Sequence, residues 1–151
     1  MLVKIQVEQD QAGNAVMKRQ EDVSKVTYKR VGVNEQALET FLEENIHLIT
    51  EEEDYELMIV GKQVINNVNK RTDLVALDSN GNIVIIEIKR DEDDMKSRKD
   101  NFESQAIRYA SSFASMSSIE ALVDSVYARY LIRYKGVSVE EAKQVGMKNI
   151  L

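Results

Sequence analysis

The sequence predicts a single domain of the mixed α/β class. The 151 residues suit one hydrophobic core, and apolar residues make up 43% of the chain, close to the globular average. Along the chain the hydrophobic period changes from strand-like to helical, back to strand-like, and then to helical again. This order lacks a βαβ repeat, so it indicates one sheet flanked by helices.

The first elements are predicted to be a β hairpin and a helix. Residues 3–8 alternate apolar and polar side chains, residues 11–14 are typical of a turn, and residues 15–20 form the returning strand. Asn34 is a favourable N-cap, and apolar residues follow it at helical spacing as far as Ile49.

The faces of this first helix are predicted from the angular positions of its side chains. Phe41 falls within the apolar stripe, which is expected to be buried. Glu35 also falls within the stripe, so it either reaches toward a site below or simply favours the helix dipole. Glu39 falls on the margin of the stripe, and Glu43 falls outside it and is expected to be solvated.

Three strands and three further helices are expected after an acidic loop. The strands are predicted over residues 55–65 with an interruption at Gly61, over residues 72–77 and over residues 82–88. The helices are predicted over residues 102–113, 119–134 and 139–145, with Ser138 as the cap of the last one.

Composition excludes several kinds of protein. There is no cysteine, and His47 is the one histidine, which argues against disulfides, Cys-based zinc sites and His-dependent catalytic triads. The sequence has no apolar run of 18 residues and does not open with a signal-peptide pattern, so the cytoplasm is the default location and no membrane partner is expected.

The net charge of −6 is unevenly distributed. Residues 1–56 hold 6 basic and 13 acidic side chains, whereas residues 57–100 hold 8 of each sign and residues 101–151 hold 6 basic and 5 acidic. Net charge alone argues against nucleic acid as a partner. Because the excess acid lies in the first third, a local contact with nucleic acid elsewhere in the chain is still expected to be feasible.

The segment from Asp73 to Lys89 carries the most informative pattern. Strand period two places Glu87 and Lys89 on one face of the strand. A two-residue turn would pair Leu74 with Glu87, whereas a three-residue loop over residues 79–81, with a glycine in the left-handed region, would pair Asp73 with Glu87. The sequence Asp-Ser-Asn-Gly favours the three-residue loop.

In that register two carboxylates and a lysine converge on one face of the sheet. Facing carboxylates repel unless a cation lies between them, and oxygen ligands of this kind suit Mg²⁺ or Mn²⁺. Lys89 would then polarise a water molecule or stabilise developing phosphate charge. Glu87 and Lys89 could also simply form a structural ion pair. A further alternative is an ion-paired hairpin without any site, which predicts a close contact between Asp73 and Lys89.

These residues resemble the PD-(D/E)XK nuclease superfamily. The match consists of Asp73 followed by Glu87-Ile88-Lys89, and residues 105–109 match the QxxxY motif of RecB-like members. The helix over residues 35–45 and the stretch over residues 59–64 are similar to the NucS/EndoMS-like and related families. The resemblance implies a restriction-endonuclease-like core with a mixed central sheet, in which a further strand follows the helix of the QxxxY motif.

The resemblance also implies roles for individual residues. Asp73, Glu87 and the Ile88 carbonyl would bind Mg²⁺ or Mn²⁺, Lys89 would orient the attacking water, and Glu35 would help to hold metal or water. Gln105 and Tyr109 would support the site, although an ordinary helix flank also explains that pair. The implied activity is metal-dependent hydrolysis of phosphodiester bonds in DNA, and a homodimer is the oligomer that the resemblance suggests.

Basic residues flank the proposed site in the sequence and are the candidate phosphate contacts. They are Lys70, Arg71, Arg90, Lys96, Arg98 and Lys99. Solvated loop charge is the alternative explanation for them. The whole chain is expected to be one domain, with a β extension over residues 1–33, a nuclease core over 34–115 and C-terminal helices over 116–151. A non-catalytic domain of the same fold that binds nucleic acid or protein is the alternative function.

Overall fold

The computed structural model describes residues 3–9, 11, 15–22, 27–65, 71–90, 102–114 and 116–151. The strands are β1 (Val3–Gln9), β2 (Ala15–Asp22), β3 (Leu57–Ile65), β4 (Arg71–Asp78) and β5 (Ile83–Ile86). The helices are α1 (Glu35–Glu44), α3 (Phe102–Phe113), α4 (Ile119–Leu122), α5 (Ala128–Lys135) and α6 (Val139–Ile150), with the 3-10 turn η1 (Ile46–Ile49) and the π turn η2 (Val123–Tyr127). None of the described helices is both long and apolar enough to cross a membrane.

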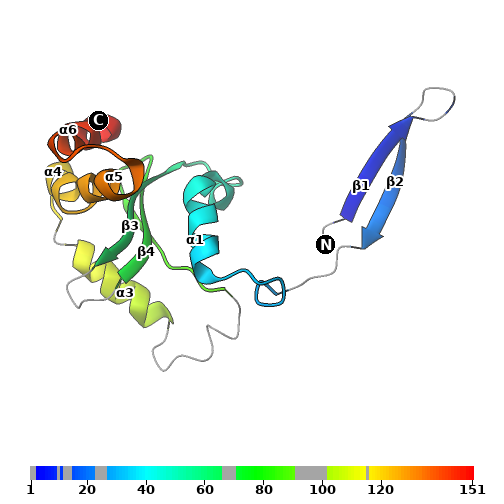
Figure 1. Cartoon of the computed structure of the whole chain (residues 1–151), viewed down its shortest axis with the longest axis horizontal. Helices are drawn as coiled ribbons and strands as arrows, with labels where there is room; N and C mark the ends of the chain where they lie inside the picture. Colours follow the sequence, from blue (N-terminus) through cyan, green and yellow to red (C-terminus); the bar gives the residue numbers. More distant parts are fainter. Residues whose placement is uncertain are drawn as a thin grey trace.

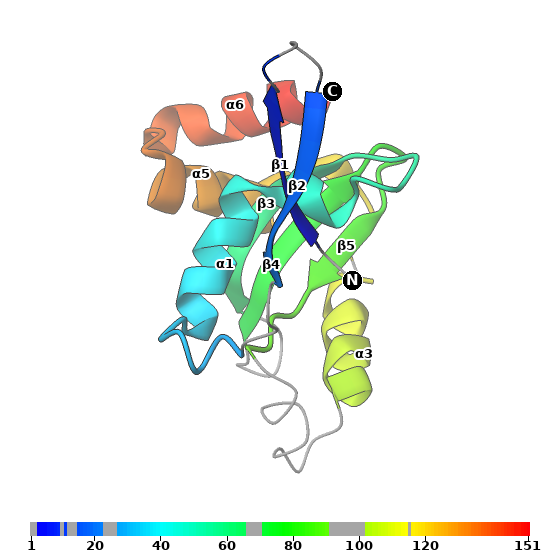
Figure 2. The ribbon, with the colours of Figure 1, turned by 90° about the vertical axis from the view of Figure 1, so that its right-hand side faces the viewer.

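The α/β class is confirmed. β3, β4 and β5 form an antiparallel sheet in that order, and β1 and β2 form a separate two-stranded sheet, which Figure 1 shows apart from the helices. In Figure 1 the three-stranded sheet lies between α1 and the helices α4–α6. Figure 2 shows α1 and α3 on opposite sides of this sheet.

The expected further strand is not found among the described residues. Residues 116–151 are described throughout and contain helices and their connections, so the described part of the central sheet is antiparallel rather than mixed. Local interactions favour helix over strand in this stretch. Ser118 and Ser138 each cap a helix by accepting a hydrogen bond from a backbone N–H of its first turn.

The predicted hairpin register is confirmed. Val75 pairs with Ile85, Gly81 has a φ of 80°, and the Asp78 N–H donates to the Asn82 carbonyl at 3.0 Å. This is the three-residue loop, in which the glycine adopts the left-handed conformation that other residues avoid.

The first helix is capped as predicted but faces a different direction. The Asn34 side chain accepts a hydrogen bond from the Ala37 N–H at 2.8 Å. Phe41 is 50% exposed, so its predicted burial is wrong, and Glu39 is buried instead. The helix turns Leu38, Leu42 and the acids toward the sheet because a lysine of β3 lies there to pair with those acids.

The third strand runs without a break where an interruption was predicted. Its register with β4 shifts between Ile59 and Gly61, which is how a bulge accommodates an extra residue. A Cβ atom at Gly61 would lie 2.7 Å from Val64 Cγ2 and 2.8 Å from Val126 Cγ1. Glycine is therefore required here for the close approach of η2 to β3.

Candidate active site at the ends of β4 and β5

Asp73 joins β4 to the chain that leaves β5. The ladder between these strands ends at the pair Leu74–Ile86, and the same register continued by one step would place Asp73 opposite Glu87. Instead of a further backbone pair, Asp73 Oδ2 accepts a hydrogen bond from the Ile88 N–H at 2.8 Å. The acid of β4 is thereby fixed against the Glu-Ile-Lys segment, as the three-residue loop predicted.

A glutamine connects Asp73 to a second carboxylate. Gln63 Nε2 donates to Asp73 Oδ1 at 3.3 Å and also makes a short hydrogen bond to Glu39 Oε2. Burial raises the pKa of Glu39, the hydrogen bond from Gln63 and the charge of Lys62 oppose that rise, and the charge of Asp73 adds to it. The amide of Gln63 thus lies between two acids that would otherwise repel each other.

The backbone of Gln63 explains how it reaches this position. Its φ is 51°, an unusual value for a residue other than glycine. Neighbouring residues of a regular strand point to opposite faces, yet both Lys62 and Gln63 contact Glu39. The left-handed residue breaks the alternation and brings both side chains to α1, and backbone strain of this kind is typical of functional sites.

A charge network centred on Glu43 joins α1 to β3 and α5. Glu43 accepts from Lys62 at 2.7 Å, from Lys135 at 2.9 Å and from the Tyr130 hydroxyl at 2.7 Å. Its side chain is 8% exposed, so the prediction that Glu43 is solvated is wrong. Burial raises the pKa of Glu43, but the three hydrogen bonds outweigh burial and hold the pKa at about 2.

Glu87 and Lys89 form a buried ion pair beyond the end of β5. Lys89 Nζ donates to Glu87 Oε1 at 2.8 Å and to the Ile88 carbonyl at 3.0 Å, and the two side chains are 8% and 5% exposed. The strand was predicted to reach residue 88 but ends at Ile86. Beyond Ile86, the hydrogen bond from the Ile88 N–H to the Asp73 side chain takes the place of a backbone pair between the strands. The contact between Glu87 and Lys89 is the one that a structural ion pair predicts. The ion-paired hairpin without a site predicted a contact between Asp73 and Lys89, and no such contact is found among the described residues.

The structure places the other predicted site residues as follows. Glu35 lies in the first turn of α1, and no hydrogen bond or ion pair joins it to Asp73 among the described residues. Glu39 lies one turn later on α1, and it accepts a hydrogen bond from Gln63, which also donates to Asp73. Gln105 and Tyr109 lie on α3, where Tyr109 is 1% exposed, so its ring belongs to the core.

The predicted phosphate contacts lie largely outside the described residues. Lys70, Lys96, Arg98 and Lys99 fall in that undescribed part. Arg71 is exposed at the start of β4, and Arg90 is partly buried directly after Lys89. The positions of Arg71 and Arg90 beside the strand ends keep them near the Asp73 site.

The donor set is chemically suited to a hard divalent cation. Asp73, Glu87 and the Ile88 carbonyl offer only oxygen atoms, which Mg²⁺ and Mn²⁺ prefer. Within the described residues, no three acidic or histidine side chains are grouped closely enough to hold a metal. Two of the three predicted ligands, Glu87 and the Ile88 carbonyl, are occupied by Lys89.

Sequence reasoning missed the residues that connect these groups. Lys62, Gln63 and Tyr130 were not selected, and Glu39 was noted only at the margin of a stripe. Lys62 and Gln63 follow Gly61, whose place inside a strand pattern was the one available signal of a bulge. The contact of Tyr130 with Glu43 spans 87 residues and leaves no local signal.

The fold and site define an α/β domain with a paired Asp and Glu-x-Lys at the ends of two antiparallel strands. Residues 32–125 match the family model described as "Shedu protein SduA, C-terminal". Because the match covers more than half of the chain, the chain belongs to this family. No curated protein and no solved structure gives a significant match. The narrower resemblance to PD-(D/E)XK and NucS/EndoMS-like nucleases stays a prediction.

Proposed function

We propose that this chain is a metal-dependent nuclease domain that hydrolyses phosphodiester bonds in DNA. The observation that carries the proposal is the hydrogen bond from the Ile88 N–H to Asp73, which fixes the acid of β4 against Glu87-Ile88-Lys89. Membership of the SduA C-terminal family supports a nuclease-related role in a defence system. The proposal includes a preference of the nuclease for particular DNA structures.

The proposed cofactor is Mg²⁺ or Mn²⁺ held by Asp73, Glu87 and the Ile88 carbonyl. When bound, such an ion polarises phosphate oxygens and lowers the pKa of a bound water. Lys89 donates to two of these three ligands, so its ammonium group and a cation would share the same oxygens. Gln63 donates to both Asp73 and Glu39 and thereby orients the carboxylate of Asp73.

The test compares variants of the three central residues on several DNA shapes. Asp73→Asn, Glu87→Gln and Lys89→Ala are incubated with labelled single-stranded, duplex and flapped DNA in Mg²⁺ or Mn²⁺. Glu140→Gln, which changes an exposed acid of α6, is the matched control. We expect at least a hundredfold loss of cleavage in the three variants and none in the control, and cleavage that persists in all three would refute the assignment.

Metal binding gives a second readout that does not depend on turnover. Titration calorimetry with Mn²⁺ is expected to detect a site in the unmodified chain and a weaker one in Asp73→Asn. Equal affinity in both proteins would remove Asp73 from the ligand set.

A non-catalytic domain that binds nucleic acid is the second candidate. It is favoured by Lys89, whose ammonium group already donates to Glu87 and to the Ile88 carbonyl, two of the three proposed ligands. It predicts DNA binding without cleavage on any of the substrates above.

A further inference from the structure

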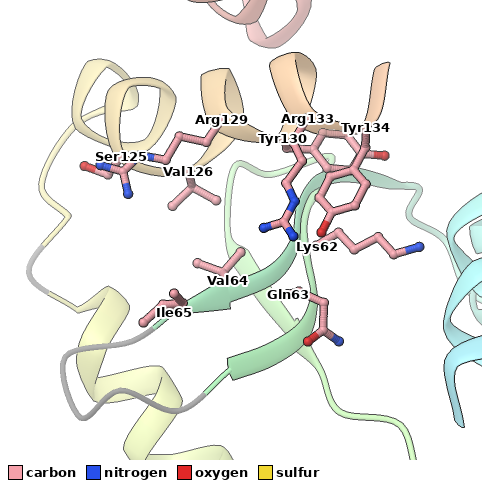
Figure 3. A pocket seen from close by; sticks show the side chains of 10 residues that line it. All are labelled: Lys62, Gln63, Val64, Ile65, Ser125, Val126, Arg129, Tyr130, Arg133 and Tyr134. Atoms are coloured by element: carbon pink, nitrogen blue, oxygen red, sulfur yellow. The ribbon is translucent and has the colours of Figure 1, made fainter. Parts of the chain in front are cut away.

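A groove lies between β3 and α5, next to the candidate active site. Residues 62–65 form one wall, and residues of η2 and α5 between Ser125 and Tyr134 form the other. Figure 3 shows Val64 and Val126 facing each other across it, while Arg133 extends from α5 toward β3. Its cavity of about 170 Å³ has room for a group the size of a phosphate, since one liquid water occupies about 30 Å³.

The side chains that line the two walls of the groove carry positive charge only. The residues that line the groove include Lys62, Arg129 and Arg133 and no Asp or Glu. The protein as a whole carries 26 acidic against 20 basic residues. The groove is therefore locally cationic in a protein that is acidic overall, which favours an anionic ligand.

Two arginines of α5 supply the uncompensated charge. Arg129 and Arg133 are one helical turn apart, both are exposed, and neither forms an ion pair with any carboxylate that the structure describes. The Arg133 guanidinium lies 5.3 Å from the centre of the Tyr134 ring. Lys62, by contrast, is neutralised by Glu43, and in Figure 3 its side chain extends away from Arg129.

The groove adjoins the Asp73 site through two residues of β3. Gln63 contributes to the groove wall, and its amide donates to Asp73 at 3.3 Å. Ile65 lines the groove and pairs with Arg71, which was predicted from the sequence as a phosphate contact. A chain of phosphates that follows the edge of β3 would pass from Arg129 and Arg133 to the site.

We infer that this groove binds the backbone phosphates of a nucleic-acid strand, with Arg129 and Arg133 as the phosphate contacts. The guanidinium group matches phosphate geometry through two parallel hydrogen bonds. The inference rests on the proposed nuclease function for the nature of the ligand, because an acidic peptide also carries negative charge. The neighbouring Asp73 site favours nucleic acid.

The test measures binding of a fluorescein-labelled 20-nucleotide single strand by anisotropy, in EDTA so that no metal-dependent cleavage occurs. The double variant Arg129→Gln/Arg133→Gln is compared with Lys143→Gln/Lys148→Gln, which removes the same charge from α6. We expect the arginine variant to bind at least about tenfold more weakly, since hydrogen bonds to charged groups are strong. Its slope of log affinity against log salt should fall by about 1.4, at about 0.7 per phosphate contact.

The outcomes separate the groove from the proposed function. Unchanged affinity and salt slope in the arginine variant would overturn the groove while leaving cleavage through Asp73 intact. If the unmodified protein neither binds nor cleaves DNA, the nuclease proposal itself fails. If polyglutamate of the same charge displaces the probe as well as unlabelled oligonucleotide does, the groove is a peptide site and its nucleic-acid assignment is wrong. Thermal melting of both double variants confirms that they are folded.

Discussion

Replacing Glu43 by glutamine is expected to destabilise the protein in a way that depends on pH. The carboxylate accepts hydrogen bonds from Lys62, Lys135 and Tyr130 while its side chain is only 8% exposed. Glutamine keeps the size of the side chain and one acceptor oxygen but removes the charge. The change therefore tests how much the charge at this position contributes to joining α1, β3 and α5.

The magnitude follows from the pKa of Glu43, which is about 2 in the folded protein against an ordinary value of 4.5. Because folding lowers this pKa, the carboxylate stabilises the protein above pH 4.5, and that contribution is lost as the pH falls toward 2. The difference corresponds to about 3 kcal/mol at neutral pH, of which about 1 is lost by pH 4 and about 2 by pH 3.

Urea unfolding at pH 7, 5, 4 and 3 measures this difference for the unmodified chain, for Glu43→Gln and for Glu44→Gln, whose exposed neighbouring acid serves as the control. At pH 7 we expect the free energy of unfolding of Glu43→Gln to be lower by about 3 kcal/mol, which in thermal melting corresponds to a fall of roughly 6–12 °C. The gap in unfolding free energy between it and the unmodified chain should narrow as the pH is lowered. A gap that stays constant from pH 7 to pH 3, or one equal to that of Glu44→Gln, would refute the reasoning.

Two further predictions concern the third strand. Gly61→Ala should lower the free energy of unfolding in urea by about 1–3 kcal/mol, because its Cβ would lie within 3 Å of Val64 and Val126. An unchanged midpoint would contradict this prediction, since it would mean that the two valine side chains move aside without loss of stability. Gln63→Gly and Gln63→Ala both lose the amide, but the glycine variant should be more stable by about 1 kcal/mol because it tolerates a positive φ. Equal stability of these two variants would contradict the strain assigned to Gln63.

Local patterns determined the elements and one long-range feature. The cap at Asn34, the helix over residues 102–113 and the antiparallel hairpin all match the sequence-based expectation. The hairpin register was predictable because a three-residue turn with Gly81 at its left-handed position allows only one pairing of the strands that follow. That register alone directs Asp73 toward the Glu87-Ile88-Lys89 segment.

Tertiary contacts decided which glutamates face the interior. Helical periodicity assigned Phe41 to the core and Glu43 to solvent, whereas Phe41 is exposed and the side chain of Glu43 is only 8% exposed. The position of a residue relative to an apolar stripe predicts only its average burial. A carboxylate is tolerated away from water only where cations and hydrogen-bond donors surround it. Those come from Lys62, Lys135 and Tyr130, which no local pattern connects to α1.

The sequence by itself determined the class of fold, the hairpin register and the pair of acids with a lysine, because turns, caps and hydrophobic period act over a few residues. Only the tertiary structure decided that Gln63 joins Asp73 to Glu39 and that the groove beside β3 is cationic. The physical reason is the range of the interactions. A side chain's charge partners and burial depend on elements that meet only when the sheet and helices pack together.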